Sequence, residues 1–97
     1  MEIKKTKNGT ELMIALTGRL DTTTAPQLEE ALEFDGVEAL HFDFAGLEYI
    51  SSAGLRVLLA SQKKMNTQGE MTVKNVNEMV MEVFELTGFS DILSIEG

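Results

Sequence analysis

From residue 12 onward, segments with the pattern of a β-strand alternate with segments with the pattern of an α-helix, and this alternation constrains the fold more than any other feature. Strands are predicted at 12–16, 39–44, 71–73 and 91–95, because each is rich in apolar residues and is bounded by turn residues. Strands that are separated by helices pair in parallel through right-handed crossovers. We therefore expect an α/β fold with a mixed, mostly parallel sheet.

The start of the chain adds a further strand. Residues 2–5 have strand character, and Asn8-Gly9 is the strongest two-residue hairpin signal in the chain. The predicted order is thus β-β-α-β-α-β-α-β, with about five strands and three or more helices in a single domain over residues 1–97. Because Leu12–Leu16 is apolar at nearly every position, we expect both faces of this strand to be covered.

Three helices are predicted from apolar residues at helical spacing and from residues typical of helix ends. Before the first helix, Thr24 and Gln27 fit a capping box, and Asp35-Gly36 closes the helix. The second helix runs from about Ala53 to Met65. The third helix follows Asn77, which can cap it.

Two adjacent serines, Ser51 and Ser52, lie at the junction of a strand and the second helix. Serine is favoured at such a junction because its side-chain oxygen accepts a hydrogen bond from a backbone N–H two or three residues further on. The same helix end carries unpaired N–H groups and the positive pole of the helix dipole, which would stabilise a phosphate on either hydroxyl. A helix cap and a phosphorylation site are therefore the two interpretations, and local geometry alone favours the cap.

The charge of the chain excludes several classes of partner. Sixteen Asp and Glu residues against eight Lys and Arg give a formal net charge of −8. Nucleic acids and anionic membranes are recognised through Lys and Arg, so neither is expected as a partner, whereas a basic or mixed-charge protein is compatible. The chain has no cysteine, no apolar run of membrane-spanning length and no signal-peptide pattern, so we expect a cytoplasmic protein.

Catalytic chemistry is poorly supported. The only histidine, His41, shares a strand face with Asp43, and with Ser52 the two could be imagined as a catalytic triad. A polar residue of the sheet is the favoured interpretation of His41, because a triad needs nucleophile and base within hydrogen-bond reach. The carboxylates lack metal-ligand spacing, and Gly54 belongs to no glycine-rich phosphate loop. We expect a binding module without metal or cofactor, not an enzyme.

Three segments of the chain resemble the STAS family. Residues 16–21, Leu-Thr-Gly-Arg-Leu-Asp, and the Thr-rich turn and helix after them are similar to the opening of the family. Residues 49–55, Tyr-Ile-Ser-Ser-Ala-Gly-Leu, resemble its central phosphorylation loop, and residues 79–89 resemble the helix and turn near its C-terminus. The three segments occur in the order of the family and cover nearly the whole chain.

The resemblance implies a bacterial anti-sigma factor antagonist that regulates transcription by partner switching. When unphosphorylated, such proteins bind an anti-sigma factor that is itself a serine kinase, and a sigma factor is released. Phosphorylation by the kinase switches the binding off, and a PP2C-type phosphatase removes the phosphate.

Carried over by position, the phosphoacceptor of the family corresponds to Ser52. The commonest loop of the family has Asp before this residue, whereas this chain has Ser51, which is therefore the second candidate. A phosphate would place a dianion against any partner surface packed on the loop, so the switch would act on the interface and not on the fold. The resemblance places the partner interface at Asp21, Thr22, Thr23, Ser51, Ala53, Gly54 and Leu55.

Another class of STAS domain is an alternative. These domains are docking subunits of lipid-transport ATPase complexes and are not phosphorylated. Ser51 in place of Asp leaves room for this function. A domain of an anion transporter is disfavoured, because the chain has no membrane-spanning segment.

Overall fold

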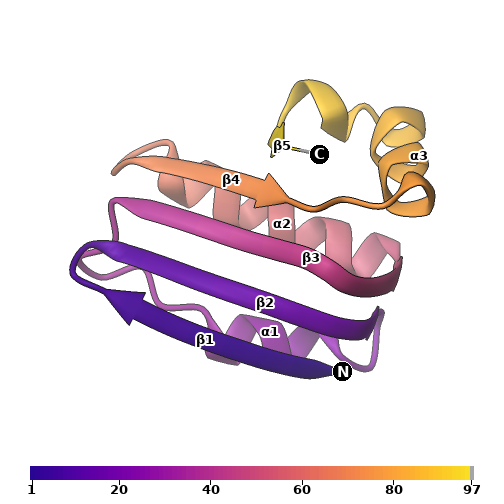
Figure 1. Cartoon of the computed structure of the whole chain (residues 1–97). Coiled ribbons are helices and arrows are strands. Elements are labelled where there is room, and N and C mark those ends of the chain that lie inside the picture. Colours follow the sequence, from indigo (N-terminus) through magenta and orange to yellow (C-terminus); the bar gives the residue numbers. More distant parts are fainter. Residues whose placement is uncertain (97) are drawn as a thin grey trace.

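The strands lie side by side in the order β1-β2-β3-β4-β5 in one sheet (Figure 1). In the computed structural model, which describes residues 1–96, β1 pairs antiparallel with β2, and all other neighbouring strands pair in parallel. The strands are β1 (Glu2–Asn8), β2 (Glu11–Leu20), β3 (Ala39–Ile50), β4 (Glu70–Lys74) and β5 (Ser94–Glu96). The helices are α1 (Ala25–Ala31), α2 (Ser52–Met65), α3 (Glu78–Thr87) and the short 3-10 helix η1 (Phe89–Asp91).

The predicted mixed, mostly parallel sheet and the predicted order of strands and α-helices are confirmed. The last strand begins at Ser94, later than the predicted Asp91, because the chain first forms η1. Gly97, the last residue of the predicted domain, lies outside the described residues. Within residues 1–96, no helix is long and apolar enough to cross a bilayer.

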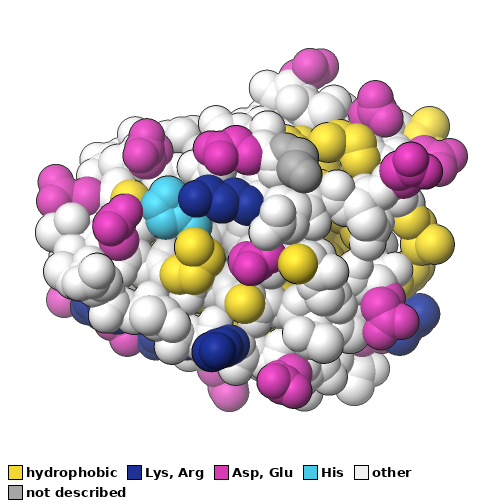
Figure 2. Space-filling model, viewed as in Figure 1, with side chains coloured by type: hydrophobic (Ala, Val, Ile, Leu, Met, Phe, Trp, Pro, Cys, Tyr) yellow, Lys and Arg dark blue, Asp and Glu magenta, His cyan; other side chains and the backbone are white. Residues whose placement is uncertain are grey.

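Within residues 1–96, helices cover one face of the sheet and leave the other open. In β2, Leu12 and Ile14 are buried on the covered face, whereas Met13 and Ala15 are half-buried on the other face. Figure 1 shows α1 and α2 on the same side, because successive right-handed crossovers that proceed in one direction along a sheet place their helices on one face. The expectation of cover on both faces is therefore wrong. Figure 2 shows the open face, where apolar groups lie among charged side chains.

β3 is longer than the predicted strand at 39–44 because it contains two irregularities that do not end it. Relative to β2, it gains one extra residue between Asp43 and Gly46 and another between Leu47 and Tyr49. Each extra residue is a β-bulge, which changes the side chains that face the helices. Buried positions are therefore two residues apart in the first half of β3 and three apart in the second. These positions are Leu40, Phe42, Phe44, Leu47 and Ile50.

The hairpin and the first helix differ in detail from their predictions. The hairpin is confirmed, but its loop is Gly9-Thr10, and Gly9 takes the positive φ of 63° that a tight hairpin turn requires. α1 is shorter than predicted, because the backbone is already extended at Leu32. Thr24 occupies the N-cap position without a side-chain cap hydrogen bond, so the predicted capping box is wrong.

α3 lies beside the second half of β3, where β4 has already ended. Val80 and Phe84 are buried, and the Phe84 ring centroid lies 6.5 Å from that of Phe44 in β3. Asn77 Oδ1 accepts a hydrogen bond from the Val80 N–H at 2.9 Å, which confirms the predicted cap. Asn77 Nδ2 donates to the Leu47 carbonyl at 2.7 Å and so satisfies one carbonyl in the part of β3 beyond its pairing with β4. α3 thus supports the strand that leads to the serines.

The opposite edge of the sheet is tied to the end of α1. Lys5 and Lys7 of β1 lie in register with buried residues of β2, and their Nζ atoms lie 2.8 and 2.9 Å from the carboxylate oxygens of Glu33. Hydrogen bonds from Lys5 and then Lys7 lower the pKa of Glu33 to about 2. These two cations are therefore engaged within the fold.

Candidate functional site

The predicted site lies where two neighbouring parallel strands, β2 and β3, end at the same edge of the sheet. Leu20 pairs with Ile50 at the last position of the register, and the Ser51 N–H donates to the Leu20 carbonyl at 2.9 Å. The carboxyl ends of parallel strands are a common place for binding sites in α/β folds, because the loops that follow them converge. The turn that begins at Asp21 and the two serines at the start of α2 are therefore neighbours.

The two serines differ in position and in exposure. Ser51 is the N-cap residue of α2, with extended backbone and no side-chain cap hydrogen bond, and its hydroxyl oxygen is buried without a hydrogen-bond partner. Ser52 is the first residue of the helix and is exposed. The cap interpretation of the loop is therefore not supported for either side chain. Of the two hydroxyls, that of Ser52 is open to an incoming group.

Asp21 organises the turn beside the serines. Its Oδ1 accepts hydrogen bonds from the N–H groups of Thr23 and Thr24 at 3.0 and 3.2 Å. The Thr24 hydroxyl accepts from the Asp21 N–H and donates to the Arg19 carbonyl, both at 2.8 Å. Asp21 thus has a structural role that the sequence analysis missed, and its side chain replaces the capping box. Thr22 and Thr23 are exposed at the tip of the turn.

The residues after the serines support the loop from the interior. Leu55 is 7% exposed, and Gly54 is buried. A Cβ atom at Gly54 would lie 2.7 Å from Leu20 Cγ and 2.9 Å from Ile50 Cγ1, so the glycine allows α2 to begin close to both strand ends. Gly54 has no side chain and Leu55 is nearly buried, so at these two positions of the predicted interface a partner would find little side-chain surface. Ala53 is half-buried and keeps part of its surface free.

Arg19 and Tyr49 form a pair on the side of the sheet opposite to Leu20 and Ile50. They are neighbours in the register, and the Arg19 guanidinium lies 4.3 Å from the centroid of the Tyr49 ring. Arg19 Nε also lies 3.8 Å from Asp21 Oδ2. The sequence analysis missed this cation–π pair, because the register that creates it depends on the bulges of β3.

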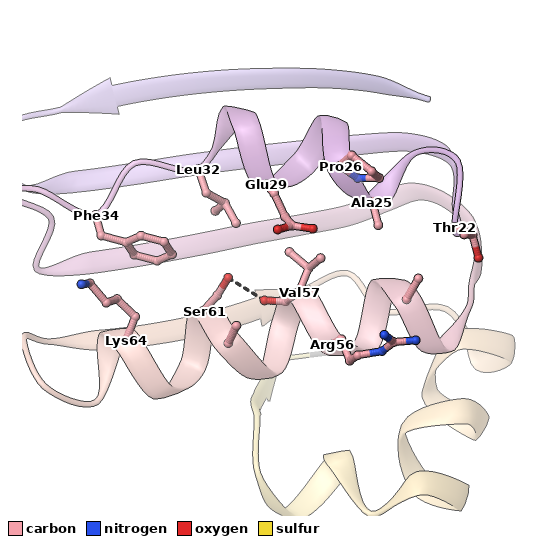
Figure 3. A pocket seen from close by; sticks show the side chains of 12 residues that line it. Thr22, Ala25, Pro26, Glu29, Leu32, Phe34, Arg56, Val57, Ser61 and Lys64 are labelled. Carbon is pink, nitrogen blue, oxygen red and sulfur yellow. Dashed lines mark hydrogen bonds between the residues drawn. The ribbon is translucent and has the colours of Figure 1, made fainter.

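A groove of about 650 Å³ lies between α1 and α2 next to the serines (Figure 3). Apolar side chains of both helices line it, with Glu29 on the α1 side and Arg56 and Lys64 on the α2 side. Two residues of the predicted interface, Thr22 and Ala53, also line it. The groove and the predicted interface are therefore continuous.

α2 carries an unusual charge for this acidic chain. It contains Arg56, Lys63 and Lys64 and no Asp or Glu. All three cations are exposed, and no ion pair within residues 1–96 includes them. Lys63 and Lys64 lie in the last turn, where the helix dipole favours them, but Arg56 lies near the N-terminal end. The sequence analysis did not name Arg56 as a site residue. Its position four residues after Ser52, on the same face of the helix, was the sequence signal that could have singled it out.

The imagined triad is not formed. His41 lies near the start of β3 and Ser52 follows its end, so the two are on the order of 30 Å apart along the strand. His41 Nε2 instead lies 3.5 Å from Glu11 Oε1. In the part of the chain that the structure describes, no group of three or more His, Asp and Glu side chains could hold a metal ion.

Comparison with known proteins agrees with this architecture. The family model of the STAS domain matches residues 2–96. The anti-sigma-B factor antagonist of Listeria monocytogenes is 32% identical over 100 residues, which cover 99% of this chain and 87% of that protein.

Solved structures have the same fold. The structure of an anti-sigma factor antagonist from Mycobacterium paratuberculosis has a TM-score of 0.87 at 23% identity and covers 98% of this chain and 84% of that chain. The anti-sigma factor antagonist SpoIIAA in its unphosphorylated form has a TM-score of 0.75 at 17% identity, covering 99% of this chain and 88% of that one. The phosphorylated form of SpoIIAA, a Bacillus cell fate determinant, has a TM-score of 0.70 at 17% identity, with 99% and 92% covered. With a family match over nearly its whole length and the same fold, this chain belongs to the STAS domain family.

Proposed function

We propose that this protein is a cytoplasmic anti-sigma factor antagonist that is controlled by phosphorylation of Ser52. The unphosphorylated form binds an anti-sigma factor that is a serine kinase, and a sigma factor is released. Phosphorylation switches this binding off, and a PP2C-type phosphatase restores it. Family membership and the names of the relatives support the proposal. The observation that carries it is the exposed hydroxyl of Ser52 at the start of α2.

The difference in burial between the two serines favours Ser52 as the acceptor. A kinase must bring the acceptor oxygen in line with the γ-phosphate of ATP, so that oxygen has to be accessible. The Ser51 hydroxyl is buried, and the Ser51 N–H is bound to the Leu20 carbonyl. Phosphorylation of Ser51 would require its side chain to leave this buried position, whereas Ser52 is already exposed.

The proposed switch works by charge. A phosphoserine carries about −1.5 to −2 charges at neutral pH. The first turn of α2 contains no acidic residue, so its N–H groups and helix dipole can accommodate this charge without refolding. A partner packed on Ala53 and on the tip of the Asp21 turn would have to desolvate the dianion. Burial of an unpaired charge costs several kcal/mol, and about 4 kcal/mol corresponds to a thousandfold loss of affinity.

Phosphorylation with a serine-kinase anti-sigma factor of the same organism and ATP tests the site. Intact-mass spectrometry should show one phosphate on the wild type and on Ser51→Ala, the matched control, and none on Ser52→Ala. Titration calorimetry should show that the phosphorylated protein binds the anti-sigma factor about a hundredfold or more weakly than the unphosphorylated protein.

Two outcomes would contradict the proposal. Phosphate on Ser52→Ala at the wild-type level would move the site, and equal affinity of both forms would remove the switch. If no serine is modified and the protein binds a transport ATPase constitutively, the function is that of a docking subunit of a lipid-transport complex.

A further inference from the structure

We propose that Arg56 binds the phosphate of phosphorylated Ser52. This inference rests on the proposed function, because it takes Ser52 as the acceptor. It adds a specific residue of α2 that holds the modified side chain.

The spacing and direction of the side chains support this pair. Residues four apart on a helix share a face, with Cβ atoms about 6 Å apart, and long helical side chains point back toward the N-terminus. Ser52 and Arg56 have this spacing, and both are exposed. In Figure 3, the Arg56 side chain extends toward the N-terminal end of α2, where Ser52 is the first residue. The guanidinium can therefore reach a phosphate on Ser52 through side-chain rotation alone.

Arg56 is also free to accept a new partner. No ion pair within residues 1–96 includes it. The other arginine, Arg19, is engaged by the Tyr49 ring and by Asp21. A guanidinium presents N–H donors in a planar fork that fits two phosphate oxygens, so the pair would be a bidentate, charge-assisted contact.

The pair would link the phosphorylation site to the groove between α1 and α2. Arg56 and Lys64 line this groove opposite Glu29. When the phosphate neutralises Arg56, the groove keeps Lys64 as its cation and loses the positive charge next to the serines. Phosphorylation would then change the charge of the groove as well as that of the loop.

Titration of the phosphate by ³¹P NMR tests the pair. Phosphoserine is incorporated at position 52 during synthesis, so the test needs no kinase. The second pKa of a phosphoserine is about 6, and a neighbouring cation lowers it because it favours the dianion. We expect this pKa to be about 0.3–0.5 lower in the phosphoserine protein with the natural Arg56 than in its Arg56→Gln variant. Arg56→Lys should give an intermediate value, and Lys63→Gln, the matched control on the same helix, should keep the wild-type value.

A second readout follows the guanidinium directly. The Nε–H resonance of Arg56 should shift as the phosphate becomes a dianion, and it should not shift in the protein without phosphate. The inference is overturned if Arg56→Gln leaves the phosphate pKa unchanged, or if Lys63→Gln changes it as much. The kinase experiment decides separately whether the anti-sigma factor phosphorylates Ser52, so failure of the Arg56 contact and failure of the proposed function can be told apart.

Discussion

The N-terminal ends of α2 and α3 are built differently, although each follows a polar residue with extended backbone. Asn77 caps α3 through the Val80 N–H, and Glu78 places a negative charge in the first turn. Ser51 precedes α2 without a cap hydrogen bond, and the first turn of α2 has no acidic residue. The positive end of α3 is therefore satisfied by its own side chains, and that of α2 is not.

The comparison shows that a helix start can be stabilised by local hydrogen bonds, as in α3, or by packing of the helix, as in α2. α2 is the longer helix, and its buried face includes Gly54, Leu55 and Leu58. Most helical stability in proteins comes from packing of an apolar face, so a well-packed helix can leave its first turn without a cap. In α2, the first turn is thereby left open to an anion. In α3, the Val80 N–H of the first turn is instead bound by the Asn77 side chain.

The largest effect is expected where α2 depends on close packing. In Gly54→Ala, the new Cβ would lie 2.7 Å from Leu20 Cγ and 2.9 Å from Ile50 Cγ1, and both side chains are buried. We expect the free energy of unfolding to fall by about 1–2 kcal/mol, because overpacking outweighs the better helix propensity of alanine. Urea denaturation measures this change.

A double mutant shows whether the contact with Leu20 is the cause. Leu20→Ala removes the side chain that the new methyl group meets, so the double mutant Gly54→Ala, Leu20→Ala should lose less stability than the sum of the two single mutants. Stability of Gly54→Ala equal to that of the wild type would show that packing at this position does not hold the start of α2.

An intermediate effect is expected at the cap of α3. Asn77→Ala removes the hydrogen bonds to the Val80 N–H and to the Leu47 carbonyl, and should cost about 1 kcal/mol of unfolding free energy. Asn77→Ser should recover part of this loss, because a serine hydroxyl can still accept from Val80. The matched change in α2, Ser51→Ala, should stay within about 0.5 kcal/mol of the wild type, because it removes no cap hydrogen bond. Equal losses in thermal or urea unfolding would abolish the contrast between the two helix starts.

The smallest effect is expected from pH at the entry to α3. Asp43 Oδ1 accepts hydrogen bonds from Asn75 Nδ2 at 2.9 Å and from the Ala45 N–H at 3.0 Å, and these bonds, Asn75 first, hold the pKa of Asp43 below its ordinary value. The folded state favours the carboxylate, so this contribution to stability is present above the unfolded pKa and is lost as the pH falls through the folded pKa. Asn75→Gly tolerates the positive φ of 58° and should raise the Asp43 pKa in an NMR titration. An unchanged pKa would show that Asn75 does not hold this carboxylate.

The two predicted helix caps had different outcomes, and the difference shows when a local sequence pattern predicts a hydrogen bond correctly. The cap by Asn77 was predicted and is confirmed, because donor and acceptor lie three residues apart in one turn. The capping box of Thr24 and Gln27 was predicted and is wrong, because the Thr24 hydroxyl accepts a hydrogen bond from the Asp21 N–H instead. A local motif was reliable only where no neighbouring group competed for the same atoms.

The strands show the corresponding limit. The positions of all five strands were predicted approximately, but the second half of β3 was not predicted. Its bulges change the spacing of buried residues from two to three. A period of two was the signal used for strands, and it fails where the pairing itself is irregular. Cover on one face likewise depends on where the helices pack, which the apolar run of β2 did not reveal.

The sequence by itself determined the order of the elements, the position of two serines at the start of α2 and the spacing of Ser52 and Arg56. Periodicity and helix-end preferences involve residues close together in the chain, so the sequence is enough to show them. The tertiary structure decided that the Asp21 turn lies beside the serines, and that the Ser51 hydroxyl is buried while Ser52 is exposed. These properties follow from the parallel pairing of β2 and β3. Burial depends on atoms brought together from distant parts of the chain, and no local pattern contains that information.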